Sequence, residues 1–254
     1  MTDLRAERVF FAYGEHTVLN GVDLVLEPGT MTLLAGRNGV GKSTLLSLLA
    51  GIRKPVEGVV LVDDEPIGAM QSMVRARTIT LIPQDSDTSF EFTGREIVMM
   101  GRHPHISRFS VPVAADHEVV EEALAITDAG HFADRSVRTL SGGELRRIHI
   151  ARALATKAPV LLADEPTANL DLEHAVAILR LLRGLAGEGH TVLLSSHDIN
   201  LIAPRCDRVA LLHESEIHTV GKPEEVLSED VVAEVFGVTS RAPTGFFPRE
   251  FDAL

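Results

Sequence analysis

The most regular feature of the chain is a series of short, almost wholly apolar runs, at 30–36, 78–83, 160–166, 191–198 and 208–214. Parallel strands covered on both faces have this composition, because neither face needs polar side chains. Helical spacing separates several of the runs, most clearly in an apolar stripe formed by Leu172, Ala175, Val176, Leu179, Leu182 and Ala186. The alternation predicts an α/β fold around a buried parallel sheet.

Two regions depart from this pattern. Segments 8–14 and 17–29 alternate apolar and polar residues without a helix between them, which predicts an antiparallel β part at the N-terminus. From about 85 to 155 the chain shows helix-like stretches and no clear buried strand. We therefore predict a domain over 2–238, with a core of about 2–84 and 156–238, an inserted helical subdomain of about 85–155, and a tail of 239–254 whose phenylalanines dock on another surface.

Composition narrows the possible functions. The formal net charge of −12 argues against nucleic-acid binding, which needs a clustered Lys/Arg surface. The single cysteine, Cys206, cannot form an internal disulfide, which fits a reducing compartment. We find neither the apolar core of a secretion signal nor a run of about 18 apolar residues, so we expect a cytosolic chain that does not itself cross a membrane.

A glycine-rich stretch, "GRNGVGKST" at 36–44, follows the first apolar run and precedes a helical pattern. It matches the phosphate-binding pattern G-x-x-x-x-G-K-[ST] in the strand-to-helix context that the pattern requires. Backbone N–H groups would bind phosphate oxygens at the positive end of the helix, Lys42 would neutralise the β- and γ-phosphates, and Ser43 would ligate Mg²⁺. The alternative is a turn that binds no ligand. The candidate binding residues are Gly36, Arg37, Asn38, Gly39, Gly41, Lys42, Ser43 and Thr44.

Polar side chains end three other apolar runs, and the carboxyl ends of parallel strands share one edge of the sheet. Asp164 is a candidate Mg²⁺ ligand, and Glu165 a candidate base for a water that attacks the γ-phosphate. Gln84 could ligate Mg²⁺ or hold water, and His197 could donate a hydrogen bond to the γ-phosphate. Taken alone, Asp164 and Glu165 would more often form a solvated turn, and a single histidine is more often structural.

Tyr13, the only tyrosine, lies upstream of the phosphate loop in "FFAYGEHTVL". An adenine ring could stack on it, and such stacking contributes about 1 to 3 kcal/mol elsewhere. A surface aromatic residue in a hairpin fits the spacing equally well.

A second glycine-rich helix start is "LSGGELRR" at 140–147. Ser141 and Glu144 form the S-x-x-E pattern of a capping box, which accounts for two residues. Gly142 and Gly143 need another reason, because glycine weakens a helix and is usually found where another group approaches the backbone closely. Their N–H groups would form a second anion site, suited to the γ-phosphate of a nucleotide held by a partner subunit.

The order of these elements resembles one family. Tyr13 comes first, followed by "GRNGVGKST", Gln84, "LSGGE", "VLLADE", "ANLD" and His197. In this order the chain resembles, over nearly its whole length, the nucleotide-binding subunit of an ATP-binding cassette (ABC) transporter. The resemblance implies a P-loop NTPase fold with a RecA-like core, an ABC ATP-binding domain over 2–238, and ATP and Mg²⁺ as cofactors. Glu144 departs from the family's commonest glutamine and Arg37 from a common proline.

The resemblance also implies a head-to-tail homodimer. Each ATP would lie between the phosphate loop of one copy and Ser141, Gly142 and Gly143 of the other, which gives the second glycine-rich helix start its function. The segment "ANLD" at 168–171 would cross the seam between the copies, with Asp171 linking the two sites.

By the same resemblance the chain is an ATPase subunit at the cytoplasmic face of a membrane. ATP would close the dimer and hydrolysis reopen it, while a groove near Gln84 and the helical insertion receives a coupling helix of integral membrane permease subunits. A periplasmic or lipoprotein substrate-binding protein would act with it indirectly. A soluble ABC ATPase acting on DNA or ribosomes fits the single cassette and acidic charge poorly, and a GTPase or kinase leaves "LSGGE" without a role.

The segment 90–105, "FEFTGREIVMMGRHPH", resembles that of importers of iron chelates, haem and cobalamin, as does the segment 221–238. Haem is slightly favoured over ferric siderophore and cobalamin, and the ATPase of another importer or an exporter is the alternative. The other interpretation of "GRHPH" is a helix end stopped by Pro104, with two solvated histidines. A zinc site is disfavoured, because no further ligands are evident nearby.

Overall fold

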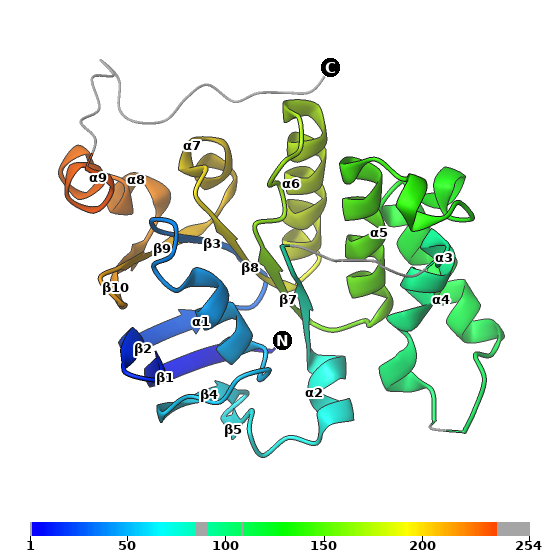
Figure 1. Ribbon diagram of the computed structural model, residues 1–254, viewed down its shortest axis with the longest axis horizontal. Helices are drawn as coiled ribbons and strands as arrows, with labels where there is room; N and C mark the ends of the chain where they lie inside the picture. Colours follow the sequence, from blue (N-terminus) through cyan, green and yellow to red (C-terminus); the bar gives the residue numbers. More distant parts are fainter. Residues whose placement is uncertain (1, 85–90, 108, 238–254) are drawn as a thin grey trace.

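The computed structural model describes residues 2–84, 91–107 and 109–237 of the 254-residue chain. Within them the chain forms two β-sheets, with helices between and beside them (Figure 1). The larger sheet has the order β10-β9-β3-β8-β7-β6. Its strands are β3 (Met31–Ala35), β6 (Ile79–Ile82), β7 (Val160–Asp164), β8 (Thr191–Ser196), β9 (Arg208–His213) and β10 (Glu216–Gly221). All but β10 pair in parallel and coincide with the apolar runs, so the predicted buried parallel sheet is confirmed.

β10 is a strand that the hydrophobic pattern did not predict. It pairs antiparallel with β9 at the edge of the sheet, after a turn in which Glu214 and Ser215 have φ angles of 44° and 71°. Its side chains are exposed or half-buried, so it lacks the continuous apolar run that marks the central strands.

The smaller sheet is antiparallel, with the order β2-β1-β4-β5. Its strands are β1 (Leu4–Tyr13), β2 (His16–Leu26), β4 (Glu57–Val62) and β5 (Glu65–Pro66). The predicted antiparallel part at the N-terminus is confirmed, and β4 and β5 extend it.

The strands of the parallel sheet send alternate side chains into two cores. In β7, Leu162 packs into the core shared with the antiparallel sheet and helix α1 (Lys42–Leu49), whereas Leu161 packs against helix α6 (Leu172–Gly187) on the opposite face. Leu172 was predicted for the buried stripe of α6, but its side chain is 52% exposed. It lies in the first turn of the helix, where it lines a surface cavity instead of the core.

The predicted helical insertion is confirmed in the described part of 85–155. Helices α3 (Gly94–Met100), α4 (Ala114–Ile126) and α5 (Gly142–Ala155) enclose a third core, which includes Ile97, Val98, Val120, Leu124 and Ile148. Residues 85–90 and the tail 239–254 lie outside the described residues. The other α-helices of the described chain are α2 (Ser72–Thr78), α7 (Ile199–Ile202), α8 (Pro223–Val226) and α9 (Glu229–Phe236). No helix of the described ranges has both the length and the apolar composition needed to cross a membrane.

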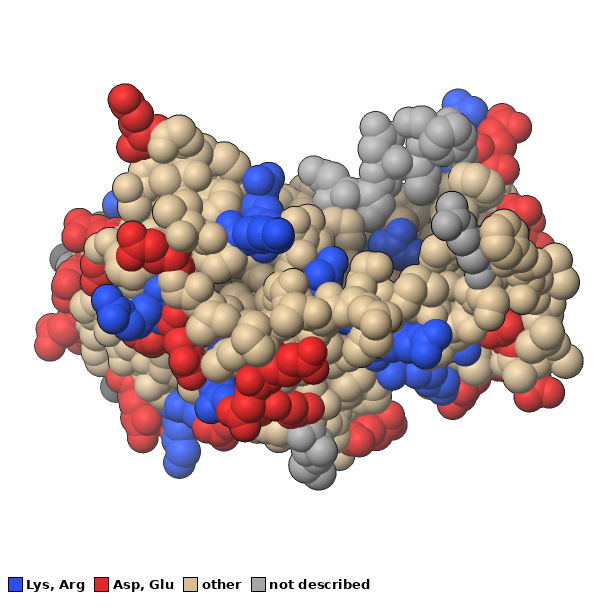
Figure 2. Space-filling view, turned by 90° about the horizontal axis from the view of Figure 1, so that it is seen from below, with Lys and Arg blue, Asp and Glu red and all other residues tan. Residues whose placement is uncertain are grey.

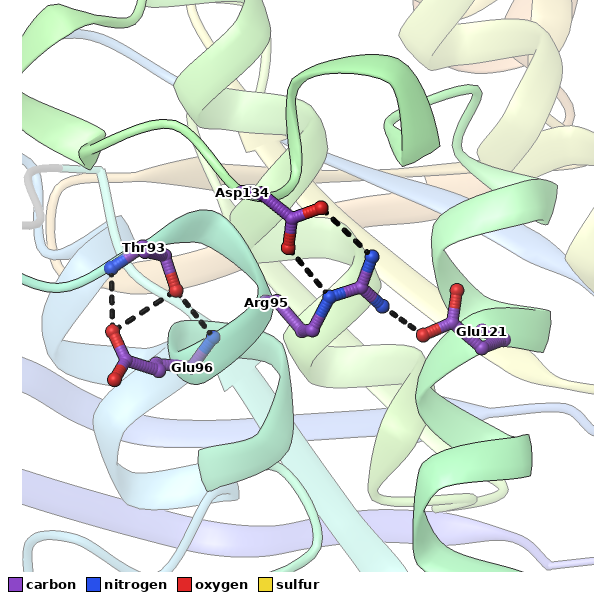
Figure 3. A network of polar contacts seen from close by, with 5 residues as sticks. All are labelled: Thr93, Arg95, Glu96, Glu121 and Asp134. Atoms are coloured by element: carbon purple, nitrogen blue, oxygen red, sulfur yellow. Dashed lines mark hydrogen bonds and ion pairs between the residues drawn. The ribbon is translucent and has the colours of Figure 1, made fainter.

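Polar contacts hold the start of α3 in this subdomain (Figure 3). Thr93 and Glu96 form a capping box, with the Thr93 N–H donating to Glu96 at 2.7 Å. The Arg95 guanidinium joins α4 to the segment before α5, because it pairs with Glu121 and with Asp134, whose Oδ1 lies 2.7 Å from Nε. Exposed pairs of this kind contribute little individually, so the apolar core supplies most of the subdomain's stability.

The segment "GRHPH" ends α3, as expected, but its two histidines differ. Pro104 lies within a short 3₁₀ turn, His103–His105, and His103 is exposed. His105 is half-buried, with Nε2 lying 2.8 Å from the carbonyl oxygen of Thr156, so the picture of two solvated histidines was wrong for His105. No cluster of three or more His, Cys, Asp or Glu residues in the described ranges is arranged to hold a metal ion.

Candidate active site

A cavity of about 500 Å³ opens at the carboxyl end of the parallel strands. Its walls come from the β1–β2 hairpin, the start of α1, and the segments that follow β6, β7 and β8. The lining residues are Tyr13, His16, Val18, Asn38, Gly39, Gly41, Lys42, Ser43, Thr44, Gln84, Glu165 and His197. Most of the residues predicted for one nucleotide-binding half therefore meet here, while His16 and Val18 of β2 were not predicted.

The backbone of the phosphate loop requires its glycines. Gly41 caps α1 with a φ of 114°, and an added Cβ would lie 3.0 Å from Cγ1 of Val18. Gly36 has a φ of 154°, and an added Cβ would lie 2.4 Å from the carbonyl oxygen of Leu212. The first hydrogen bond of α1 runs from the Leu45 N–H to Gly41. The earlier N–H groups of the helix precede that bond, which leaves them available to an anion in the cavity.

Lys42 is held across the loop. Its side chain is buried, and Nζ donates to the carbonyl oxygens of Gly36 at 2.9 Å and Arg37 at 3.1 Å. Burial lowers the pKa of this ammonium group, while the charges of Glu165 and Asp164 raise it. The Lys42 ammonium group thus brings a positive charge to the cavity, and the loop groups that it binds are neutral carbonyls.

Two carboxylates lie at the end of β7, and contacts with β8 hold them in place. Asp164 is buried, and its Oδ1 accepts a hydrogen bond of 2.5 Å from Oγ of Ser195, the residue paired with it in register. The same Oγ accepts a bond of 3.0 Å from the Glu165 N–H. Ser195 was not predicted as a site residue. Its position as a polar residue inside an apolar run could have indicated a role in the site.

Glu165 leaves the line of the strand, because its φ of 44° is left-handed. Its carboxylate is largely buried, and Oε2 lies 2.8 Å from Nδ1 of His197, whose side chain is 56% exposed. The structure therefore places the candidate base, Glu165, beside His197, the candidate hydrogen-bond donor to the γ-phosphate. An ionised carboxylate only accepts hydrogen bonds, so Nδ1 carries the hydrogen when Glu165 is charged.

Helix α5 is tied to the same edge of the sheet through Arg146. This buried guanidinium donates to the carbonyl oxygens of Pro83 at 2.9 Å and Gln84 at 2.8 Å. One turn later, His149 is buried, and within the described chain neither ring nitrogen has a hydrogen-bond partner. Burial lowers its pKa to about 4, so it stays neutral near pH 7. Arg146 was missed at the sequence level, because the carbonyl groups of Pro83 and Gln84 are more than sixty positions away from it along the chain.

Tyr13 lies at the rim of the cavity, with 46% of its surface exposed. The Phe11 ring meets it edge-on, with centroids 5.0 Å apart, and the Arg53 guanidinium lies 5.0 Å from the Tyr13 centroid. An adenine that stacks on this ring would share it with Arg53.

The second glycine-rich segment lies outside this cavity. The predicted capping box is present, because Ser141 Oγ accepts from the Glu144 N–H at 3.3 Å and the Ser141 N–H donates to Glu144 at 2.7 Å. A Cβ added to Gly142 would have Leu170 Cδ2, at 3.9 Å, as its nearest neighbour, so this glycine faces open space. Gly143 differs, because the His174 side chain of the same chain occupies the space beside it. An added Cβ would lie 2.7 Å from Cδ2 of His174.

Asp171 also lies outside the first cavity, at the start of α6, where it caps the helix by accepting from the His174 N–H at 2.9 Å. A second cavity of about 440 Å³ shares Gln84, Glu165 and His197 with the first and continues along residues 167–170. Within one chain, then, Ser141 to Gly143 and Asp171 do not reach the phosphate loop, which is the arrangement that a site shared between two copies requires.

The family model of the ABC transporter matches residues 19–168. The chain belongs to the ABC transporter family. This membership confirms what the ordered motifs predicted, and the chain is an ATP-binding cassette with the mixed α/β fold of that family.

Individual relatives agree with this result. The cassette is 42% identical over 240 residues to the hemin import ATP-binding protein HmuV of Pseudomonas aeruginosa, which covers 92% of each protein. It is 42% identical over 220 residues to the cobalamin import ATP-binding protein BtuD of Halobacterium salinarum, covering 86% of the cassette. The match covers 55% of BtuD, so the chain spans about half the length of that relative.

Solved structures of a bacterial ABC transporter cassette are also similar. A dimeric structure is 29% identical with a TM-score of 0.76, and it covers 87% of this cassette and 98% of that chain. A dimeric post-hydrolysis state bound to ADP and Pi is 28% identical, with the same TM-score of 0.76 and the same coverage of 87% and 98%.

Proposed function

We propose that the cassette is the ATP-hydrolysing subunit of an importer that takes up an iron chelate through a membrane permease, with haem as the favoured substrate. The observation that carries the ATPase part is the meeting of Lys42, Glu165 and His197 at one cavity. The similarity to HmuV over 92% of both proteins supports import of haem, and the similarity to BtuD keeps cobalamin among the candidates.

The donor set at the cavity fits a nucleotide with Mg²⁺. The glycines leave room for phosphate oxygens against the start of α1, and Lys42 supplies positive charge. Ser43 and Gln84 line the cavity with a hydroxyl and an amide oxygen, and Asp164, buried next to the lining residue Glu165, offers a carboxylate. These are oxygen ligands of the kind that Mg²⁺ prefers. Mg²⁺ would neutralise charge on the β- and γ-phosphate oxygens.

In this proposal Glu165 accepts a proton from the attacking water, and His197 holds the Glu165 carboxylate in place through Nδ1. A neutral imidazole whose hydrogen is on Nδ1 has only an acceptor at Nε2. Donation from His197 to the γ-phosphate therefore requires a hydrogen on Nε2 as well as on Nδ1, as in the imidazolium form.

The second half of each site comes from another copy of the chain. Ser141 and Gly142 offer a hydroxyl and an open helix start, and a partner's nucleotide would complete that site. The dimeric structure of a similar cassette supports a homodimer, and the head-to-tail arrangement is part of our proposal. We place the cassette at the cytoplasmic face of the membrane, where it would work with a permease and, indirectly, with a periplasmic or lipoprotein substrate-binding protein.

A groove of about 390 Å³ between α2, β6 and α5 is the proposed docking site for the permease. Arg75 and Arg152 line this groove, and no described Asp or Glu residue lines it. Neither arginine forms an ion pair with another described residue. Burial lowers the pKa of Arg152. Figure 2 views the face that carries α2 and shows basic side chains in its middle, with acidic ones below them and around the edges. We infer that a cytoplasmic helix of the permease places a carboxylate here.

Replacing both arginines, as Arg75→Gln with Arg152→Gln, is expected to weaken association with the permease by about tenfold or more, because a largely desolvated charge pair is lost. ATP affinity of the isolated cassette should not change. Co-purification of the tagged cassette with its permease from membranes measures the effect, with Lys222→Gln, an exposed site at α8, as the matched control. Unchanged co-purification of the double variant would remove these arginines from the interface.

Deletion of the gene tests the importer itself. The deletion strain should lose growth on haem or a ferric chelate as sole iron source and grow normally on ample free iron, with restoration by the intact gene. Uptake of labelled haem, ferric siderophores and cobalamin is then measured directly. Wild-type uptake of all of them in the deletion strain would contradict the substrate assignment and leave the ATPase proposal standing.

A further inference from the structure

The imidazole of His174 occupies the space that Gly143 leaves open. A Cβ on Gly143 would lie 2.7 Å from Cδ2 and 3.1 Å from Cγ of His174. Real Cβ atoms do not approach other atoms so closely, so the ring packs directly on the backbone of the second glycine. Among the described residues, Gly142 has no comparable neighbour. Of the two glycines, Gly143 accommodates a side chain of its own chain, whereas no described residue fills the space beside Gly142.

Asp171 fixes the orientation of this ring. Oδ1 of Asp171 lies 2.7 Å from Nδ1 of His174 and also accepts the His174 backbone N–H at 2.9 Å. These bonds lower the pKa of Asp171, the backbone bond contributing most. Because the carboxylate only accepts hydrogen bonds, Nδ1 carries a hydrogen, and the ring is held with its opposite edge towards Gly143.

The contacts thus form a continuous path within one chain, from Asp171 through His174 to the first turn of α5. We propose that His174 is a positioning residue, which fixes the distance between the Asp171 loop and the segment 141–143. The inference rests on the proposed function, in which both elements face the partner copy. With His174 in place, the Asp171 loop and the segment 141–143 form one rigid surface that faces the partner.

His174→Ala should therefore lower kcat for ATP hydrolysis by about tenfold or more and weaken ATP-dependent dimerisation, because small misplacements of reacting groups are costly. The affinity of the monomer for ATP should not change, since His174 lies outside the first cavity. A purely structural role would instead lower the melting temperature and leave kcat of the folded protein unchanged. His190→Ala, just beyond the other end of α6, is the matched control and should retain kcat.

A double-mutant cycle with Gly143→Ala isolates the contact. In the unaltered chain, Gly143→Ala should displace the His174 ring and abolish most of the activity. In the His174→Ala background the added methyl group has room, so Gly143→Ala should lower kcat by no more than about twofold. Equal losses from Gly143→Ala in both backgrounds would overturn the proposal, because the glycine would then serve only the partner's nucleotide.

An unchanged kcat and unchanged dimerisation in folded His174→Ala would also overturn it. Should that variant not fold, His174→Asn replaces it in both arms, since its amide can still donate to Asp171 but has no ring to meet Gly143. Failure of the proposed function has a separate signature: the unaltered chain would neither hydrolyse ATP nor dimerise with it. If this inference fails, the unaltered chain is active, and substitution of His174 changes neither kcat nor dimerisation.

Discussion

Glu165→Gln is expected to slow ATP hydrolysis by about 10²- to 10⁴-fold, the range typical of general acid–base assistance, while ATP still binds. Glutamine keeps the size of the side chain, so its amide can still lie beside Nδ1 of His197, but it cannot take a proton from water. The phosphate loop, with Lys42 and Ser43, is untouched. The variant should therefore accumulate as an ATP-bound dimer.

Steady-state phosphate release with excess Mg²⁺, nucleotide titration and size-exclusion chromatography with ATP measure the three parts of this result. Glu214→Gln is the matched control, because Glu214 is a second glutamate with a left-handed φ of 44° but lies in the β9–β10 turn. It should hydrolyse ATP at the normal rate. Near-normal hydrolysis by Glu165→Gln would show that another group is the base.

Much of this site could be predicted because its residues lie at the ends of apolar runs. The runs that end near Glu165 and His197 are buried on both faces, so the pattern identified them as parallel strands, and parallel strands present their carboxyl ends at one edge. The phosphate loop is equally local, since its glycines, lysine and helix start are adjacent in sequence.

The groups that hold the site together could not be predicted in this way. Ser195 contacts Asp164 across a strand pairing, and Arg146 reaches the end of β6 from the helical subdomain. These contacts depend on how β7, β8 and α5 are placed in three dimensions, and no local pattern encodes that placement. The same holds for His174, which looks like an ordinary polar position of α6 until its ring is seen against Gly143.

The structure distinguishes the two glycines in a way that the sequence pattern cannot. Glycine in a helix start indicates close approach of some group, but not which chain supplies it. The structure assigns the space beside Gly143 to the same chain and leaves the space beside Gly142 open. The expectation of a partner's nucleotide therefore depends most directly on Ser141 and Gly142.

Ser141→Arg tests that expectation, and we expect it to abolish ATP-dependent dimerisation and hydrolysis. The arginine side chain would fill the open space in front of α5 where the partner's nucleotide is proposed to lie. Binding of ATP to the monomer should stay largely intact, because Ser141 does not line the cavity of the phosphate loop. Titration of the monomer with ATP, sedimentation with ATP, and phosphate release measure binding, association and catalysis separately.

Loss of the helix cap is the main competing explanation, because replacing a capping serine costs about 1 kcal/mol of stability. Ser228→Arg controls for it: Ser228 caps α9 in the same way, with its Oγ 3.4 Å from the Val231 N–H, and it lies outside both cavities at the nucleotide site. This variant should lose a similar amount of stability and keep its activity. If Ser141→Arg instead loses ATP binding while its melting temperature matches that of Ser228→Arg, the segment acts within its own chain. The head-to-tail dimer would then be the wrong description of the site.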